Sequence, residues 1–343
     1  MLKEEQVMDL FNNFSDRCSL FQEEKNFLQS LFCLDLTERK RILMAADEKR
    51  KFFHGKKLYV RGVIELSNIC KNKCKYCSMS SDNESLHRYI IPKEEVFEIL
   101  FRWVNMGIKV FHFSSGEQNG YLIEDLVEIL ECVHSLKAKA IIVLGNKRNN
   151  DLIKMKKACP DITLIEKFET SNPWLYNEYN DKNGNLEFRL SQLNIARELG
   201  FKIGTGNIVG LPYQSHSTLI DDLMMLKKIK PDQASTSNYI RSGQSVFSKF
   251  KEKSNVNDNT KLFIALMRLG LDGKTIIPTN SSLGTVGKEE ALHCGANLVS
   301  LNLTPEQYLD NYIIYDKKRR KKADIDSVFE IAKLNKMEVE FEF

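Results

Sequence analysis

The chain has 343 residues, of which 42% are hydrophobic and 28% are charged, and its formal net charge is +4. This composition supports a substantial core and excludes an intrinsically disordered chain. No apolar run approaches the ~20 residues that a membrane-spanning helix needs, and the N-terminus has no apolar signal region. We therefore expect a globular cytoplasmic protein without a membrane partner. Its mild positive charge does not exclude small anionic substrates.

Residues 1–54 carry apolar side chains at helical spacing, among them Leu10, Phe11 and Phe14, and predict a helical N-terminal extension. Residues 55–310 alternate short apolar runs with longer amphipathic segments. The apolar runs predict strands near 58–65, 109–115, 139–145, 162–169, 202–208, 232–239, 274–280 and 297–302. The segments between them predict helices near 93–107, 121–136, 148–157, 187–199, 215–229, 257–270 and 286–294. Residues 311–343 predict a basic segment and a helix that packs on this main domain.

The repeated order of strand and helix predicts an α/β fold in which parallel strands close into a (β/α)8 TIM-type barrel. An open, doubly wound sheet is the alternative architecture. The active sites of such barrels lie at the C-terminal ends of the strands. We therefore expect the functional residues in the segments that directly follow the predicted strands.

The first predicted strand is followed by Cys70, Cys74 and Cys77, which have the spacing C-x3-C-x2-C. Three thiolates in one loop can bind three irons of a four-iron cluster and leave the fourth iron without a protein ligand. A structural zinc site is the alternative, because His87 could complete a set of three cysteines and one histidine. A zinc loop could stand anywhere in the chain, so the position directly after a strand favours the cluster.

This loop, with Tyr76 beside its last cysteine, resembles the signature of the radical S-adenosylmethionine (SAM) superfamily. The resemblance implies that Cys70, Cys74 and Cys77 hold a 4Fe-4S cluster, and that SAM binds the open iron through its amine and carboxylate. It also implies that one electron cleaves SAM to methionine and a 5′-deoxyadenosyl radical.

The second predicted strand ends in Ser115-Gly116-Glu117. The glycine allows a ligand to approach the backbone closely, and the Glu117 carboxylate can accept charge-assisted hydrogen bonds from an ammonium group. The resemblance implies that this turn holds the amine of SAM, with Ser115 in place of the first glycine of the superfamily's motif.

The fourth predicted strand ends in Lys167-Phe168-Glu169, and its alternation places Lys167 and Glu169 on one face. A mutual ion pair is one interpretation of these charges. The other, which the resemblance favours, is that Glu169 contacts SAM and Lys167 contacts a substrate anion. Arg189, in the next predicted helix, has a planar fork suited to a carboxylate and is the candidate for the carboxylate of SAM.

The resemblance also implies residues beside the adenine of SAM. Ile208, in the glycine-rich run 204–212, offers an apolar surface next to glycines that allow a flat ligand to approach. Leu301, in the eighth predicted strand, is a second candidate for the edge of adenine. Tyr76 is a third, because it could cover the ring from the cysteine loop.

Within the superfamily the chain resembles the subgroup of biotin synthase, methylornithine synthase and the iron-iron hydrogenase maturase. The motifs that carry this resemblance occur in order as Ile64-Glu65-Leu66-Ser67-Asn68-Ile69-Cys70, Ser115-Gly116-Glu117, Glu169-Thr170-Ser171-Asn172-Pro173, Ile208-Val209-Gly210-Leu211-Pro212 and Cys294-Gly295-Ala296-Asn297. The second-cluster cysteines of biotin synthase correspond to Phe113, Ile141 and Gly204, which cannot ligate iron. The arginine and aspartate by which methylornithine synthase holds its product fall near Ser235 and Ser282.

We therefore predict a radical SAM enzyme, similar to the hydrogenase maturase, that abstracts hydrogen from a small molecule bearing a carboxylate or a thiol. Lys167 and Arg241 are the candidates for substrate contact. A reducing partner such as flavodoxin or ferredoxin is implied. A carbon-skeleton mutase acting on an amino acid and a zinc-stabilised nucleic-acid-binding module are the alternatives.

The basic run 317–322 is the feature that raises the nucleic-acid alternative. It has no interleaved aromatic residues, and a solvated loop is the commoner interpretation of such a run. We therefore expect no nucleic-acid partner.

Overall fold

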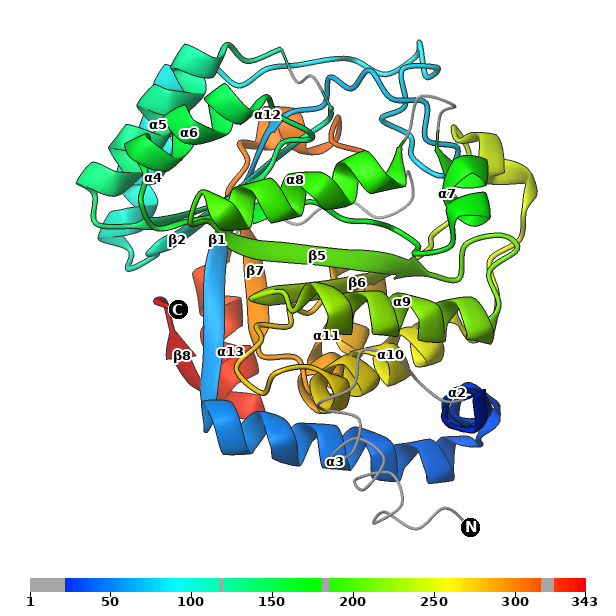
Figure 1. The fold of residues 1–343 in the computed structure, drawn as a ribbon. Coiled ribbons are helices and arrows are strands. Elements are labelled where there is room, and N and C mark those ends of the chain that lie inside the picture. The colour runs from blue at the N-terminus through cyan, green and yellow to red at the C-terminus, as the bar shows by residue number, and fades with distance from the viewer. Residues whose placement is uncertain (1–21, 118–119, 181–184, 316–323) are drawn as a thin grey trace.

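The computed structural model describes residues 22–117, 120–180, 185–315 and 324–343. In chain order its elements are α2 (Gln22–Ser30), η1 (Leu31–Cys33), α3 (Leu36–His54), β1 (Lys57–Ser67), α4 (Lys93–Asn105), β2 (Val110–Ser115), α5 (Ile123–Ser135), β3 (Lys139–Val143), α6 (Asn149–Ala158), β4 (Ile162–Ile165), α7 (Pro173–Tyr179), α8 (Leu186–Glu198), β5 (Lys202–Val209), α9 (His216–Ile229), β6 (Gln233–Asn238), η2 (Val246–Lys249), α10 (Val256–Gly270), η3 (Ser281–Leu283), α11 (Gly284–Leu292), β7 (Leu298–Asn302), α12 (Glu306–Leu309), α13 (Ile325–Leu334) and β8 (Glu338–Glu340). Figure 1 shows helices wrapped around the outside of a strongly twisted sheet.

The strands form one sheet in the order β6-β5-β4-β3-β2-β1-β7, and β8 pairs with the beginning of β1. All of these pairings are parallel. The prediction of an α/β fold on a curled parallel sheet is therefore confirmed. Because the carboxyl ends of parallel strands lie at one edge, the segments after β1, β2, β4, β5 and β6 are brought to the same end of the molecule.

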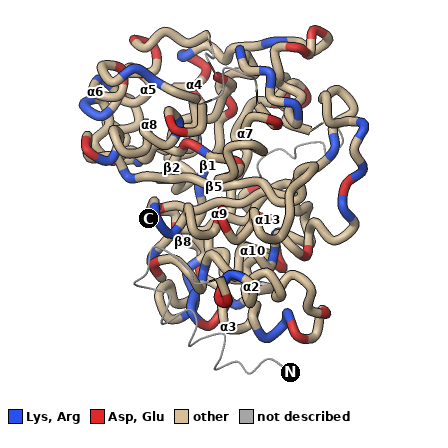
Figure 2. The backbone as a smooth tube through the Cα atoms, turned by 45° about the vertical axis from the view of Figure 1, so that its right-hand side comes forward, with Lys and Arg blue, Asp and Glu red and all other residues tan. Residues whose placement is uncertain are grey.

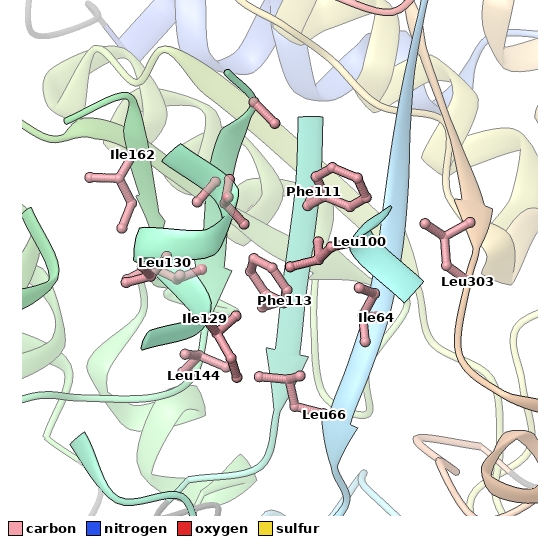
Figure 3. Close-up of a cluster of buried hydrophobic side chains, with 14 of the residues drawn as sticks. Ile64, Leu66, Leu100, Phe111, Phe113, Ile129, Leu130, Leu144, Ile162 and Leu303 are labelled. Carbon is pink, nitrogen blue, oxygen red and sulfur yellow. The ribbon is translucent and has the colours of Figure 1, made fainter. Parts of the chain in front are cut away.

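The outward face of the sheet is covered by apolar packing. Ile64 and Leu66 of β1 and Phe111 and Phe113 of β2 belong to a buried cluster that they share with Leu100 of α4 and Ile129 and Leu130 of α5 (Figure 3). Side chains alternate along a strand, so the intervening residues of the same strands, such as Arg61 and His112, point to the concave inner face of the sheet. We call the space that this face encloses the inside of the curl. The hydrophobic core thus holds the sheet from outside and leaves polar groups inside.

The predicted strand near 274–280 differs from the prediction. It forms isolated bridges instead of a regular strand, and these join Gln233 of β6 to Ile276 and Pro278 to Leu298 of β7. Proline has no backbone N–H to donate to a ladder, which limits regular pairing here. The fourth predicted strand is also shorter than expected, because β4 ends at Ile165, and beyond it Glu169 forms an isolated bridge to Asn207 of β5.

The structure adds elements that the pattern did not predict and leaves some predictions untested. Helix α7 and strand β8 were not predicted, since both are too short to show a period. The expected helix around Leu10 and Phe14 and the basic run 317–322 lie outside the described residues. Among the described helices, none is long and apolar enough to cross a membrane.

The beginning of the sheet is closed by α3 and by the C-terminal segment (Figure 1). Helix α3 packs on α10, and its last residue, His54, is buried beside Arg268 of α10. The His54 Nε2 lies 2.8 Å from the carbonyl oxygen of Gly273, and Arg268 donates to the same oxygen at 2.7 Å. Burial, followed by the charge of Arg268, lowers the pKa of His54 to about 4.

This lowered pKa predicts a loss of stability in acid. The folded state disfavours the protonated ring, so the stabilisation is present above the ordinary pKa of 6.5 and is lost as the pH falls toward about 4. Between pH ~7 and ~5, His54 should cost up to about 2 kcal/mol in the free energy of unfolding. Urea unfolding should show a smaller loss over this interval for His54→Gln than for the wild type. Equal losses would contradict the burial of a neutral His54.

Candidate active site

The three cysteines lie in the 68–89 segment after β1, which contains no helix or strand. Irregular backbone needs other hydrogen-bond partners, and Asn68 and Arg88 supply them. The Asn68 amide nitrogen donates to the carbonyl oxygens of His87 and Asn311 at 2.8 and 2.7 Å. The Arg88 guanidinium donates to four loop carbonyls, those of Asn68, Met79, Ser80 and Asn83. Sequence reasoning gave neither residue a role, because neither belongs to a ligand spacing.

The cysteine side chains are half-buried. The Cys74 thiol lies 3.1 Å from the Asn180 side-chain oxygen, and the Glu117 N–H points to Cys70 Sγ at 3.4 Å. Burial raises the pKa of Cys77 to about 12, and burial together with the neighbouring thiols raises that of Cys74. A bound metal centre reverses this effect, because a coordinating thiol is deprotonated. In the described part of the chain, no three His, Cys, Asp or Glu side chains converge closely enough to hold a single metal ion.

The turn after β2 is packed directly against the cysteine loop. A Cβ atom on Gly116 would lie 2.2 Å from the Ile69 carbonyl oxygen and 2.5 Å from Cys70 Cβ, so only glycine fits. The Lys71 N–H donates to the Glu117 carbonyl oxygen at 2.9 Å. The predicted Ser115-Gly116-Glu117 motif is thus brought beside the thiols.

The Glu117 carboxylate is oriented by the segment after β3. Its Oε1 accepts the Asn146 N–H at 2.8 Å. Gly145, which has φ +71°, leaves room for this carboxylate, since a Cβ there would lie 2.4 Å from Oε2. A buried carboxylate held from one side keeps its remaining oxygen lone pairs for a ligand.

Arg189 of α8 is shared by acidic groups from two strand ends. Its Nη1 lies 2.9 Å from Glu166 Oε2, and its Nη2 lies 3.7 Å from Glu117 Oε2. Its Nε donates to the Tyr176 hydroxyl at 3.2 Å. Burial acts to lower the pKa of Arg189, but the surrounding groups, Glu166 first, raise it above its ordinary value. Burial raises the pKa of Glu166 to about 7, against the opposing charge of Arg189. The longer contact leaves Glu117 the less tightly bound of the two carboxylates.

Glu169 occupies a strained position after β4. Its φ of +61° is unusual for a residue with a side chain, and its backbone bridges Asn207 of β5. Asp222, buried on α9, holds the next residues by accepting from the Ser171 N–H at 2.6 Å and from the Asn207 amide at 2.9 Å. Asp222 thus holds both the segment after Glu169 and Asn207, the residue that Glu169 bridges. Sequence reasoning did not identify Asp222.

Lys167 and Glu169 form the mutual ion pair that the sequence left open as one interpretation, with 3.3 Å between Nζ and Oε2. Lys167 also donates to the Ser237 hydroxyl of β6 at 3.0 Å, so it reaches across the inside of the curl. Tyr76 and Ile208 are brought together in one apolar cluster with Leu175, Leu211 and Phe247.

The structure does not bring two predicted residues to this group. Leu301 packs in the cluster between the sheet and the outer helices, because β7 turns Ser300 and Asn302 inward instead. Its expected contact with adenine does not agree with that orientation. Arg241 follows β6, but its guanidinium donates to the Ser248 carbonyl oxygen at 3.2 Å, on the 246–249 segment. No contact joins Arg241 to Lys167 or Glu169 among the described residues.

A second group that sequence reasoning missed lies deeper inside the curl. Arg61 of β1 is buried and donates from Nε to the Ser300 hydroxyl at 3.0 Å. Its Nη1 has no hydrogen-bond partner in the described part of the chain. Burial lowers the pKa of Arg61 to about 9 and that of neighbouring His112 well below its usual value. The signal in the sequence was an arginine inside a mostly apolar strand, which also contains Glu65.

These groups fit the cluster and the SAM that the sequence resemblance implies. Three thiols in one loop supply sulfur ligands, and the glycines at 116 and 145 allow the Glu117 turn and its carboxylate to pack beside this loop. Glu117 and Glu169 can accept from an ammonium group, and Arg189 can donate to a carboxylate.

Comparison with known proteins agrees with this geometry. Residues 64–226 match the Radical SAM superfamily. The chain is 32% identical over 273 residues to the FeFe hydrogenase maturase subunit HydE of Thermotoga maritima, which covers 79% of this chain and 77% of that protein. It is 27% identical to the 3-methylornithine synthase of Methanosarcina acetivorans, over 90% of this chain and 88% of that one.

Solved structures show the same fold. The crystal structure of methylornithine synthase superposes with a TM-score of 0.83 at 23% identity, and covers 96% of this chain and 97% of that chain. The structure of HydG, a maturase of the FeFe hydrogenase, superposes with a TM-score of 0.81 at 17% identity, over 99% of this chain and 77% of that one. With thiols, carboxylates and arginine gathered at one end of the parallel sheet, the chain belongs to the radical SAM superfamily and is a radical SAM enzyme that uses a 4Fe-4S cluster and SAM.

Proposed function

We propose that the protein performs HydE-like chemistry on a small molecule that carries a carboxylate or a thiol. When bound, the cluster and SAM supply a 5′-deoxyadenosyl radical, which abstracts hydrogen. The observation that carries this proposal is the contact of Gly116 and Glu117 with the cysteine loop, because it fixes a carboxylate beside the three thiols. The 32% identity to HydE supports it further.

The proposed roles follow from the contacts. Cys70, Cys74 and Cys77 hold the cluster. Glu117 and Glu169 accept from the ammonium group of SAM, and Arg189 donates to its carboxylate while Glu166 and Tyr176 hold the guanidinium in place. We expect the backbone of Ser115 and Gly116 to lie beside the amine, and Tyr76 and Ile208 offer an apolar wall for adenine.

Two cations support an anionic substrate. Lys167 reaches across the inside of the curl, and Arg61 is a buried guanidinium that makes no ion pair with a described residue. An unpaired buried charge is costly, so a substrate anion would relieve Arg61. Ser235 and Ser282, near the places of the arginine and aspartate expected of methylornithine synthase, favour the maturase over an amino-acid mutase.

The surrounding architecture supports the same proposal. We infer that the sheet closes into a complete barrel, since residues 276–278 bridge both β6 and β7. A reducing partner such as flavodoxin or ferredoxin supplies the electron. A cytoplasmic location agrees with the free cysteines of the described residues.

The reaction is tested by isotope transfer. The reconstituted protein, incubated without air with dithionite, SAM and deuterated thiol- or amino-acid candidates, should form 5′-deoxyadenosine that contains deuterium from one of them. Mass spectrometry of the nucleoside makes the measurement. Cleavage without deuterium from any carboxylate- or thiol-bearing candidate would contradict the proposed substrate class, and an absence of cleavage would contradict the reaction itself.

Gly116→Ala should reduce bound iron, because its Cβ would overlap the Ile69 carbonyl oxygen and displace the cysteine loop. We expect less than about half of the wild-type iron per chain, by analogy with the cost of forcing a side chain into a packed site. Gly200→Ala is the control, since Gly200 has φ +82° and an added Cβ would meet only Lys156, at 3.5 Å. It should lose stability but keep its iron. Full iron in Gly116→Ala would remove the packing argument.

Glu117→Gln should weaken SAM binding by roughly 10- to 100-fold, the value of a charge-assisted hydrogen bond, while iron content stays intact. The glutamine side chain keeps an oxygen that can accept the Asn146 N–H, so the substitution removes only the negative charge. Arg189→Ala should have an effect of similar size. Glu187→Gln, at an exposed position of the same helix, is the control. Calorimetric affinities equal to that of the wild type would exclude both residues from SAM binding.

A further inference from the structure

A continuous row of aromatic rings leads from the cysteine loop to the surface. The Lys75 N–H donates to the Tyr179 carbonyl oxygen of α7 at 2.8 Å, and the Lys75 carbonyl accepts the Phe247 N–H of η2 at 2.9 Å. Ring centroids are then 5.9 Å apart for Tyr179 and Phe247, and 5.3 Å apart for Phe247 and Phe250. The α7 and η2 segments therefore both contact the backbone of Lys75, the residue between Cys74 and Tyr76.

The row ends on an exposed apolar surface. Phe250 and Tyr213 have centroids 5.4 Å apart, and Tyr213 and Trp174 have centroids 6.1 Å apart. Trp174 is 60% exposed, Tyr213 is 58% exposed and Val246 is 52% exposed. We call Trp174, Tyr213, Val246 and Phe250 the aromatic face. Scattered exposed apolar residues are normal, but aromatic side chains in mutual contact are typical of binding surfaces.

The aromatic face is bordered by positive charge. Lys249, Lys251 and Lys253 are exposed on the segment that carries Phe250. Figure 2 shows this segment on the right-hand side, where blue outweighs red. The acidic residue among them, Glu252, accepts the backbone N–H of Arg241 at 2.6 Å. Lys249 and Lys251 make no ion pair with a described residue, so their charges are available to a partner.

We propose that the aromatic face and its lysines are the docking surface of a small acidic protein that carries a flavin and delivers the electron. This inference rests on the proposed function, because the electron is needed only if the thiols of the loop hold a cluster. Lysines attract an acidic protein and speed its association. Exposed aromatic rings suit a flat flavin edge, whereas an iron–sulfur carrier offers no ring to stack upon them.

With a cluster held by Cys70, Cys74 and Cys77, this surface would serve a one-electron transfer. The reduced flavin of the partner would lose one electron and the iron–sulfur centre would gain it, and no bond would form or break. Docking at the aromatic face places the carrier against α7 and η2, the segments that hold the cysteine loop through Lys75.

The test measures binding of the full-length protein to an oxidised acidic flavodoxin by calorimetry, at low and at moderate salt. Trp174→Ala should weaken binding at least about tenfold, as truncation of an aromatic anchor does. Lys251→Glu should weaken it by a similar factor at low salt and reduce its salt dependence. Phe52→Ala and Lys40→Glu, at exposed positions of α3 at the opposite end of the molecule, are the matched controls and should bind like the wild type.

A second measurement separates this inference from the proposed function. With dithionite as reductant, all four variants should cleave SAM at the wild-type rate, whereas with reduced flavodoxin Trp174→Ala and Lys251→Glu should be slower by about the loss in affinity. If both variants bind flavodoxin like the wild type, the docking surface is wrong. If they weaken binding of a ferredoxin but not of flavodoxin, the choice of a flavin carrier is wrong. Failure of the wild type to cleave SAM with dithionite would overturn the proposed function and, with it, the need for the electron.

Discussion

The contact between the cysteine loop and the turn after β2 is the constraint on which the rest of the site depends. An irregular loop has no ladder to fix it, so its position comes from single contacts. Gly116 allows the two segments to approach until the next residue's N–H points to the Cys70 sulfur. This approach joins the thiols proposed to hold the cluster to the carboxylate proposed to bind the amine of SAM.

The charges around this contact are arranged so that they hold each other before a ligand binds. Arg189 is closest to Glu166, which leaves Glu117 a longer, weaker contact. Glu169 is paired with Lys167, which is itself held by Ser237. A ligand with both an amine and a carboxylate can replace these contacts in kind. The charges of the site are therefore largely paired within the fold, and ligand binding exchanges these partners for the charged groups of the ligand.

The sequence predicted those parts of the site that are local in the chain. The cysteine spacing and the Ser115-Gly116-Glu117 turn are short patterns, and the alternation of strands and helices places such turns at one end of a sheet. Residues that act through tertiary contacts were not predictable in this way. Asp222 holds the segment after Glu169 from α9, about fifty residues later in the chain. The position of Arg61 becomes informative only when the structure shows that its side chain points to the inside of the sheet.

Leu301 shows the limit of pattern reading within a strand. The sequence places Leu301 correctly in a strand, but side chains alternate with a period of two, and the pattern alone does not show that Leu301 faces the outer helices. Strand β8 is too short to show a period, and the predicted strand near 274–280 forms isolated bridges instead of a regular strand. Their pairing depends on neighbours that the local pattern does not contain.

Helix α7 shows how a short unpredicted element can serve several parts of the site at once. Asn172 caps it by accepting the Leu175 N–H at 3.0 Å, and Pro173 stands at its first turn, so the helix begins directly after the Glu169 segment. Its Tyr176 hydroxyl accepts from Arg189, its Tyr179 carbonyl accepts from the cysteine loop, and its Trp174 is exposed. This short helix thus joins the arginine, the thiols and the surface. Because these groups share one element, a displacement of α7 would alter ligand binding, the cysteine loop and the proposed docking surface together.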